Sequence, residues 1–355
     1  MEYMSKVREF LELTIKEQAS DLHLSASHPP ILRVNGKLIP LVKFEKFTAE
    51  QVEGLAFALI DEEQKARFLA DKEIDFSYNF EDRARFRVNV FFQMGEISVA
   101  MRLIVAKIKS IEELNLPPIL NDFAVANQGL VLITGPSSHG KSTTLAAIID
   151  KINHSRADHI ITIEDPVEYI FEDDRSIIDQ REVYQDTLSF ARALRATFRQ
   201  DPDVIMVGEM RDPETMAIAI TAAETGHLVF ATLHTNSASQ TIHRIVDSFP
   251  PEQQSQIRAQ LSGSLLGVIS QRLIPRLKGG LIPACEIMLS TPAVANLIRE
   301  NNVHELPLVI ETSGEMGMIS LDRSLAELVK RREISLENAL AYSSNPAELR
   351  MLVRR

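Results

Sequence analysis

The chain has 355 residues, of which 45% are apolar and 25% charged, a balance typical of a folded protein and too apolar for an intrinsically disordered one. Acidic residues outnumber lysine and arginine by 49 to 38, and the net charge of −11 disfavours a nucleic-acid partner or an anionic membrane surface. At about 100 to 200 residues per domain, the length predicts two or three domains.

The first hundred residues combine helical and strand patterns. Residues 4–19 place apolar side chains at helical spacing, residues 20–25 alternate as a strand does, and two short apolar runs flank Asn35-Gly36 as in a hairpin. Residues 49–70 have a helical pattern again. Three β-rich runs follow, at residues 75–80, 83–93 and 96–105. The pattern predicts an α+β N-terminal domain of residues 1–105 and a linker of residues 106–118.

Residues 119–355 have a different hydrophobic pattern. Four short apolar runs alternate with helical segments, at residues 129–134, 159–165, 203–209 and 227–234. Such alternation is typical of an α/β fold with a parallel sheet covered by helices, in which ligands bind at the carboxyl ends of the strands. The last hundred residues are mostly helical by pattern. We therefore predict one α/β domain with C-terminal helices.

The N-terminus and the cysteine count indicate a cytoplasmic protein. Residues 1–18 carry charges throughout, where a signal peptide needs an apolar stretch. No uncharged apolar run approaches the roughly 18 residues of a membrane-spanning helix. The single cysteine, Cys285, excludes an intramolecular disulfide and a multi-cysteine zinc site.

The loop after the first predicted parallel strand has the sequence of a phosphate-binding loop. Residues 135–142, GPSSHGKS, match G-x-x-x-x-G-K-[ST] between a predicted strand and a predicted helix. Backbone N–H groups would hold the phosphates, Lys141 would reach the β and γ phosphates, and Ser142 would offer its hydroxyl to Mg²⁺. We expect the side chain of His139 to be exposed and to point away from the loop; the alternative is a direct contact with the nucleotide. The predicted nucleotide-binding residues are Gly135, Pro136, Ser137, Ser138, His139, Gly140, Lys141, Ser142 and Thr143.

Acidic residues and histidines lie at the ends of the next strands. Glu164, Asp165 and Glu168 follow the second strand and Glu209 the third, so each is a candidate for organising a metal ion and water, or else a plain helix cap or turn residue. The fourth strand is flanked by two histidines. Their separation of seven residues points them to opposite faces of a regular strand, which argues against a shared metal. The one at the carboxyl end is placed as a γ-phosphate sensor would be. These residues are His227 and His234.

A register argument singles out two arginines of the N-terminal domain. If Met94-Gly95 is a two-residue turn, counting back from it makes one face of the hairpin wholly apolar. The predicted pairs are Gln93 with Glu96, Phe92 with Ile97, Val90 with Val99, Val88 with Met101 and Phe86 with Leu103.

The same register sets Arg87 directly opposite Arg102. Two like charges directly opposed on a sheet are destabilising unless an anion such as a phosphate lies between them. Alternatively, both arginines extend into solvent and nearby acids such as Glu81 or Asp82 compensate. In an oligomer, this face could supply arginines to the ATP of a neighbouring subunit.

Together these motifs resemble the PilT-like retraction ATPases of type IV pili, within the wider family of secretion and pilus traffic ATPases. The resemblance spans nearly the whole chain and includes SDLHLSA, RFRVN, GLVLITGPSSHGKSTTLAAIID, ITIEDPVEY, QREV, GEMRDPET and TAAETGHLVFATLHT. It implies a PAS-like N-terminal domain and a RecA-like ATPase domain in a homohexameric ring. It also implies Mg²⁺-dependent ATP hydrolysis that powers pilus retraction, and peripheral attachment to the inner membrane through a platform protein at the pilus base.

The resemblance assigns roles to particular residues. Glu168 corresponds to the glutamate that polarises the attacking water, and Glu209 to the Walker B glutamate, which with Ser142 is the expected metal-binding pair. The sequence alone does not choose Glu168 over Glu164 or Asp165. The family's histidine box and its phosphate-contacting arginines correspond to His227, His234, Arg87 and Arg102.

Two departures from the family pattern leave a second function open. Ser137, Ser138 and His139 replace the usual Thr, Gly and Ser, which favours slower hydrolysis or a stiffer loop. Residues 293–300, AVANLIRE, differ near their start from the AIRNLIRE-like segment of retraction ATPases. The alternative is a PilU-like accessory or regulatory ring subunit that supports a paralogous retraction ATPase. Extension ATPases are disfavoured because they typically carry a four-cysteine zinc module.

Overall fold

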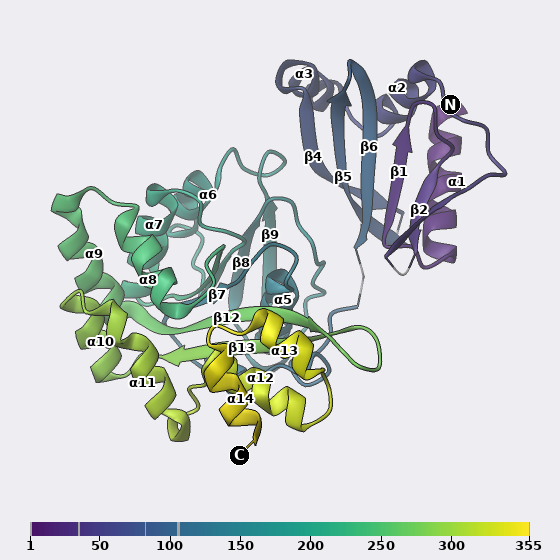
Figure 1. Cartoon of the computed structure of the whole chain (residues 1–355). Helices are drawn as coiled ribbons and strands as arrows, with labels where there is room; N and C mark the ends of the chain where they lie inside the picture. The colour runs from purple at the N-terminus through teal and green to yellow at the C-terminus, as the bar shows by residue number, and fades with distance from the viewer. Residues whose placement is uncertain (1, 35, 82, 105–106, 355) are drawn as a thin grey trace. The chain divides into compact units, whose positions relative to one another are not determined.

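A computed structural model describes residues 2–34, 36–81, 83–104 and 107–354 (Figure 1). By internal contacts the chain divides into two units. The first is Met1–Lys107 with Asp165–Ile170, and the second is Ile108–Glu164 with Phe171–Arg355. Asn35 of the predicted hairpin turn lies outside the described residues, as do Val105, the last residue of the predicted N-terminal domain, and Ala106, the first of the predicted linker.

The first unit is built on a six-stranded antiparallel sheet with the order β3-β2-β1-β6-β5-β4. Three helices bury apolar side chains against the same face of this sheet, and a single core results. The elements in chain order are α1 (Glu2–Lys16), β1 (Asp21–Ser25), β2 (Ile31–Val34), β3 (Lys37–Pro40), α2 (Ala49–Phe57), α3 (Glu62–Asp71), β4 (Glu73–Phe80), β5 (Ala84–Gln93) and β6 (Glu96–Ile104).

Residues 49–70, predicted as helical, form two helices rather than one. Helix α2 ends at Phe57, and α3 begins at Glu62. The break occurs because Asp61 is the N-cap of α3: its carboxylate accepts from the Gln64 N–H, and the Gln64 side chain accepts from the Asp61 N–H. Such a reciprocal pair satisfies two backbone donors that a continuing helix would use internally.

The hairpin of β5 and β6 confirms the predicted register. Met94 and Gly95 have φ values of 50° and 84°, as a two-residue turn with both central residues left-handed requires. All five predicted pairs occur, and Arg87 lies opposite Arg102. The apolar residues of one face, among them Phe86, Val88 and Met101, are buried in the core.

The second unit contains a seven-stranded sheet with the order β13-β12-β7-β11-β10-β8-β9. All neighbouring strands are parallel except β12 and β13. The four predicted strands are confirmed as β7 (Gly129–Thr134), β8 (His159–Glu164), β10 (Val204–Val207) and β11 (Leu228–Leu233). The other strands are β9 (Ile177–Glu182), β12 (Leu265–Pro275) and β13 (Leu281–Leu289). The helices are α4 (Leu120–Ala124), α5 (Lys141–Ser155), α6 (Phe190–Thr197), α7 (Pro213–Glu224), α8 (Ala238–Asp247), α9 (Pro251–Ser264), α10 (Pro292–Arg299), α11 (Leu306–Thr312), α12 (Leu321–Lys330), α13 (Leu336–Tyr342) and α14 (Pro346–Arg354).

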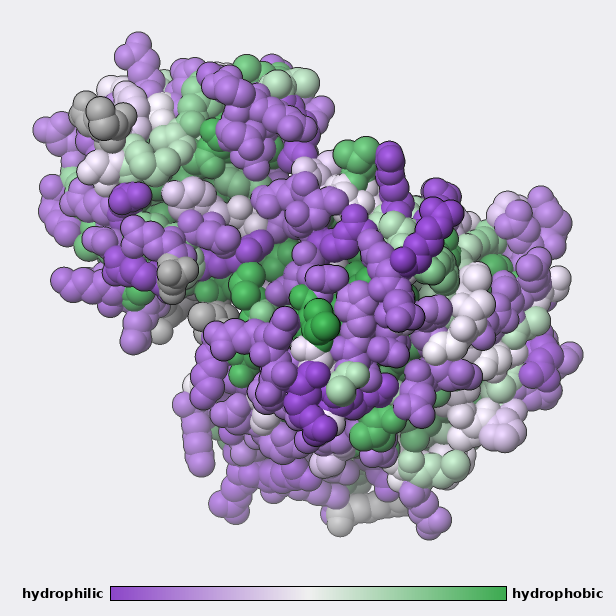
Figure 2. All heavy atoms as spheres, turned by 180° about the vertical axis from the view of Figure 1, so that it is seen from behind, coloured by the Kyte–Doolittle hydropathy of each residue, from purple (hydrophilic) through white to green (hydrophobic). Residues whose placement is uncertain are grey.

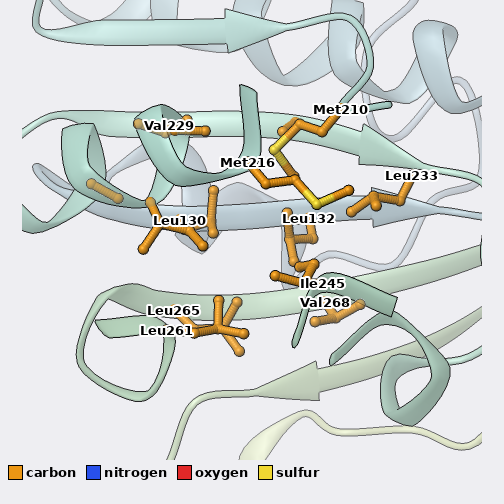
Figure 3. Packing of buried hydrophobic residues seen from close by; sticks show 14 of the residues in the cluster. Leu130, Leu132, Met210, Met216, Val229, Leu233, Ile245, Leu261, Leu265 and Val268 are labelled. Carbon is orange, nitrogen blue, oxygen red and sulfur yellow. The ribbon is translucent and has the colours of Figure 1, made fainter. Parts of the chain in front are cut away.

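Helices cover both faces of this sheet. Leu130 and Leu132 of β7 lie in the same core cluster as Met216 of α7 and Ile245 of α8 (Figure 3). The alternate residues of β7 point to the other face, where α5 packs. Because both faces are buried, the strands appear in the sequence as continuous apolar runs rather than as alternating patterns.

The sequence patterns did not predict β9, β12 and β13. Strands β12 and β13 form an antiparallel pair in a region whose other elements are mostly helices. Their sequences, LLGVISQRLIP and LIPACEIML, are mostly apolar without a clear alternation, and periodicity alone does not separate such runs from a buried helix. The missed pair matters, because β12 lies beside β7 and the loop that follows it.

Within the described ranges, no helix is long and apolar enough to cross a membrane. Hydrophilic residues cover most of the face seen in Figure 2, and hydrophobic residues lie there in small separate groups.

Phe86→Ala tests the core of the first unit. The Phe86 side chain is fully buried on the apolar face of the hairpin, so its removal leaves a cavity. We expect the free energy of unfolding of this unit, measured in urea, to fall by about 3–5 kcal/mol. Phe91→Ala is the matched control, because Phe91 lies in the same strand and is only partly buried. Equal losses for the two variants would contradict the assigned faces.

Candidate nucleotide-binding site

Three adjacent parallel strands, β7, β11 and β10, end at the same edge of the second sheet. The phosphate-loop sequence follows β7, His234 follows β11, and Glu209 comes two residues after β10. The parallel topology therefore brings together side chains that are up to about a hundred residues apart in sequence, at the edge where such sheets bind ligands.

The backbone of the loop requires glycine at its start. Gly135 has φ +143°, and a Cβ there would lie 2.3 Å from the carbonyl oxygen of Gln271 in β12. Gly140, with φ +81°, is the N-cap residue of α5 and brings no side-chain hydrogen bond to the helix end. The first turn of α5 thus presents backbone N–H groups and a positive dipole end, a suitable arrangement for an anion.

Lys141, the first residue of α5, is held over the loop. Its Nζ donates to the carbonyl oxygens of Gly135 and Pro136, at 2.9 Å each, and the residue is only 8% exposed. The same Nζ lies 3.4 Å from Nδ1 of His234. The ammonium group is therefore positioned at the loop and kept out of bulk solvent.

His234 links the loop to Glu209. Its Nδ1 is 3.4 Å from the Ser137 hydroxyl as well as from the lysine amine, and its Nε2 is 3.5 Å from the Glu209 carboxylate. Glu209 also pairs with Arg211. An amine, an imidazole and a carboxylate thus form a row across the ends of three strands, which is the arrangement expected for groups that surround a phosphate chain.

His227 lies at the opposite edge of the sheet. It precedes β11, and its Nδ1–H donates to the carbonyl oxygen of Ala222, while its ring packs edge-on against Phe198. The six residues of β11 lie between His227 and His234, so seven steps of about 3.3 Å each put the two histidines about 23 Å apart. Within one chain, the structure does not bring His227 to the loop.

The acidic residues at and after the end of β8 differ in their surroundings. Glu164 is 7% exposed, and its carboxylate accepts from the Thr162 hydroxyl at 2.7 Å and the Gln180 amide at 3.2 Å. These hydrogen bonds hold the Glu164 carboxylate within the sheet. Glu168 belongs to the segment that groups with the first unit, and its side chain is 38% exposed. Of the two, Glu168 is accessible to a reactant.

Each of the two opposed arginines pairs with carboxylates. Arg102 Nε donates to Asp21 at 3.0 Å, while Arg87 lies between Asp75, at 3.7 Å, and Glu168, at 3.5 Å. Acids of the protein thus compensate the predicted repulsion between the two arginines. A phosphate could take the same role.

Of the acids named in the sequence-based alternative, Glu81 does not compensate the two arginines. Glu81 pairs with Arg8 at 3.7 Å, and Asp82 lies outside the described residues. Asp21 takes the compensating role because β1 lies beside β6 and sets it directly opposite Arg102. This pairing joins strands that are about 80 residues apart, so local patterns do not indicate it.

Strand β12 contacts the phosphate loop, and the sequence analysis did not predict this contact. Gln271 is 2% exposed; its Oε1 accepts from the Thr144 hydroxyl at 2.7 Å, and its Nε2 donates to the backbone oxygen of His139 at 2.9 Å. The only sequence feature that could have indicated it was the glutamine within the polar triplet Ser270-Gln271-Arg272, in an otherwise apolar run. The side chain of His139, expected to be exposed, is half-buried because the Leu273 N–H donates to its Nδ1 at 2.9 Å.

The residues at this edge fit a magnesium–nucleotide complex. The Ser142 hydroxyl on the first turn of α5 and the Glu209 carboxylate are oxygen donors, which Mg²⁺ prefers. Within the part of the chain that the structure describes, no group of three or more His, Cys, Asp or Glu side chains could hold a metal by itself. Few protein ligands are needed where substrate phosphates supply the rest.

Gly135→Ala tests the close approach of the loop to β12. The new Cβ would meet the Gln271 backbone oxygen, which cannot move without its strand. We therefore expect the free energy of unfolding, measured in urea, to fall by about 1–2 kcal/mol from backbone strain and by roughly a further 1–3 kcal/mol from the steric overlap. Gly279→Ala is the control, because Gly279 has φ +85° and no heavy atom within 4 Å of the added Cβ. The Gly279→Ala variant has the backbone strain without the steric overlap. Equal losses of unfolding free energy in the two variants would contradict the close approach of Gly135 to β12.

Comparison with known proteins agrees with this arrangement. The family model "Type II/IV secretion system protein" matches residues 3–339. The chain is 46% identical to the type IV pilus retraction ATPase PilT of Pseudomonas aeruginosa over 96% of this chain and 98% of that protein. It is 40% identical to the type IV pilus ATPase PilU of the same species over 97% of this chain and 90% of that protein.

A solved structure is also similar. The crystal structure of the pilus retraction motor PilT with bound ADP has a TM-score of 0.89 and 45% identity, over 97% of this chain and 98% of that one. The match supports the mixed α/β fold class with a RecA-like ATPase domain. From its motifs, its fold and these similarities, the chain belongs to the family of type II/IV secretion system proteins.

Proposed function

We propose that this chain is an ATPase that powers type IV pilus retraction and hence twitching motility. The observation that carries the proposal is the row of Lys141, His234 and Glu209 beside a phosphate loop whose backbone is shaped by β12. Similarity to PilT along almost the full length of both chains supports the choice of pilus retraction among the functions of the family.

In the proposed reaction, water attacks the γ-phosphorus of ATP, the bond to the β–γ bridging oxygen breaks, and ADP and phosphate leave. The N–H groups of the loop and of the first turn of α5 bind the phosphates, and Lys141 neutralises their charge. Ser142 and Glu209 would hold Mg²⁺, which when bound supplies further positive charge at the β and γ phosphates. His234 would hydrogen-bond the γ-phosphate.

Glu168 is the proposed base. Its carboxylate orients the attacking water and takes a proton from it, a role that needs the accessibility that the buried Glu164 lacks. Arg87 and Arg102 are proposed to stabilise charge on the γ-phosphate in the transition state. Their present partners are the carboxylates of Asp75, Asp21 and Glu168, so binding would replace one anionic partner by another.

The proposed assembly is a homohexamer that acts on a platform protein at the pilus base in the inner membrane. His227 is at the far edge of its own sheet, so a role in hydrolysis would require the nucleotide of a neighbouring subunit. A second candidate function is a PilU-like accessory subunit beside a paralogous retraction ATPase. The loop residues Ser137 to His139 favour it, since His139 ties the loop to β12 and stiffens it.

Glu168→Gln tests the proposed base. We expect the Mg²⁺-dependent ATP turnover of the purified protein to fall by about 10²–10⁴-fold, because the amide cannot accept the proton of the water. Glu172→Gln is the matched control: it makes the same chemical change at an exposed position four residues away and should leave turnover unchanged. Full turnover in Glu168→Gln would exclude this assignment.

The oligomer mass and the turnover of the wild-type protein, measured on the same samples, separate the two candidate functions. A hexamer that turns over ATP and loses activity in Glu168→Gln supports the retraction motor. A hexamer that binds ATP and scarcely hydrolyses it supports the accessory subunit.

Lys141→Ala tests the phosphate site. Loss of the ammonium removes the charge that the loop holds beside the phosphates, and we expect turnover to fall by at least about 100-fold. Lys151→Ala removes the same group from an exposed position further along α5 and is the control. Undiminished turnover in Lys141→Ala would rule out the proposed site.

A further inference from the structure

The reaction proposed above leaves the imidazole of His139 without a role, although the structure holds it firmly. The Leu273 N–H donates to its Nδ1, and the Gln271 side chain donates to its backbone oxygen, both at 2.9 Å. On another side, its ring lies edge-on to Tyr342 of α13, with the ring centres 6.5 Å apart. This one loop residue is thus attached twice to β12.

The position of Leu273 explains why β12 needs such a partner. Strand β7 pairs with β12 only as far as Thr134 opposite Ser270, and then turns away into the phosphate loop. Strand β12 continues to Pro275, so its N–H groups on that side no longer face a strand. A backbone N–H without a partner in a partly buried position is costly, and the imidazole supplies the missing acceptor.

We propose that His139 is a positioning residue that clamps the phosphate loop to β12 through its unprotonated Nδ1, so that nucleotide affinity depends on pH. The inference rests on the proposed function, in that the loop is taken to hold a nucleotide. It concerns the shape of the loop and not the chemical step.

The clamp requires one protonation state. Because Nδ1 accepts a hydrogen bond, the ring proton lies on Nε2, and a second proton on Nδ1 would set a donor against the Leu273 N–H. The groups that face the ring are Lys141 from the loop helix, Arg272 from β12 and the phenol of Tyr342 from α13. Burial, followed by the charges of Arg272 and Lys141, lowers the pKa of His139. The clamp is therefore complete at neutral and higher pH, and it is lost as the pH falls through this lowered pKa.

The test compares wild type with His139→Asn and His139→Ala in the full chain. The Asn Oδ1 can accept from the Leu273 N–H and does not titrate, whereas Ala has no acceptor. Two quantities are measured between pH 5.5 and 8: the affinity for ADP, and the hydrogen exchange of the peptide that contains Leu273 in the absence of nucleotide. His243→Asn, at an exposed position on α8, is the control for histidine titration elsewhere.

At pH 8 we expect wild type and His139→Asn to agree, while His139→Ala binds ADP about 10-fold more weakly and exchanges the Leu273 amide faster. On acidification, the affinity ratio of wild type to His139→Asn should fall towards that of His139→Ala. His243→Asn should follow wild type throughout.

The two readouts keep the outcomes distinct. If wild type fails to bind ADP at every pH but its Leu273 amide is protected by His139, the clamp is supported and the proposed function fails. If His139→Ala matches wild type in both affinity and exchange at every pH, the clamp is overturned. If His139→Ala does not fold, the comparison of wild type with His139→Asn across pH gives the same decision.

Discussion

The site depends on the close approach of the phosphate loop to strand β12. Gly135 leaves no room for a side chain against the Gln271 carbonyl, and the Gln271 side chain joins Thr144 of α5 to the backbone of His139. A buried amide of this kind stabilises only when its donors and acceptor are used, and here both ends find partners. The loop therefore takes its shape from a strand more than a hundred residues away, and α5 is oriented by the same contacts.

The loop held by β12 lies at the edge of the parallel sheet where the polar side chains collect. Because β7, β11 and β10 are buried on both faces, their apolar side chains are confined to the core, and polar groups gather only where the strands end. Lys141, His234 and Glu209 meet there, within 3.5 Å of their neighbours. The ammonium group of Lys141, the imidazole of His234 and the carboxylate of Glu209 thus lie side by side where a phosphate chain would bind.

In the first unit, charged side chains are positioned by pairing across neighbouring strands. Its hairpin opposes Arg87 and Arg102, and each is balanced by a carboxylate from another strand. Arginines arranged in this way are kept extended and ready for a stronger anion. The hairpin register followed from a two-residue turn and a count of apolar positions, and it proved correct in every pair. The balancing acids did not follow, since Asp21 meets Arg102 through the pairing of β1 with β6.

The sequence by itself therefore determined features that depend on neighbouring residues: the phosphate loop between strand and helix, the four apolar parallel strands, the hairpin register and the family. Tertiary structure alone decided that β12 lies beside the loop, that His139 is anchored rather than exposed, and that Glu164 is enclosed while Glu168 is accessible. The physical reason is the range of the interactions. Backbone dihedrals and hydrophobic periodicity act over a few residues, whereas each of these contacts joins segments that only the order of strands in the sheet makes neighbours.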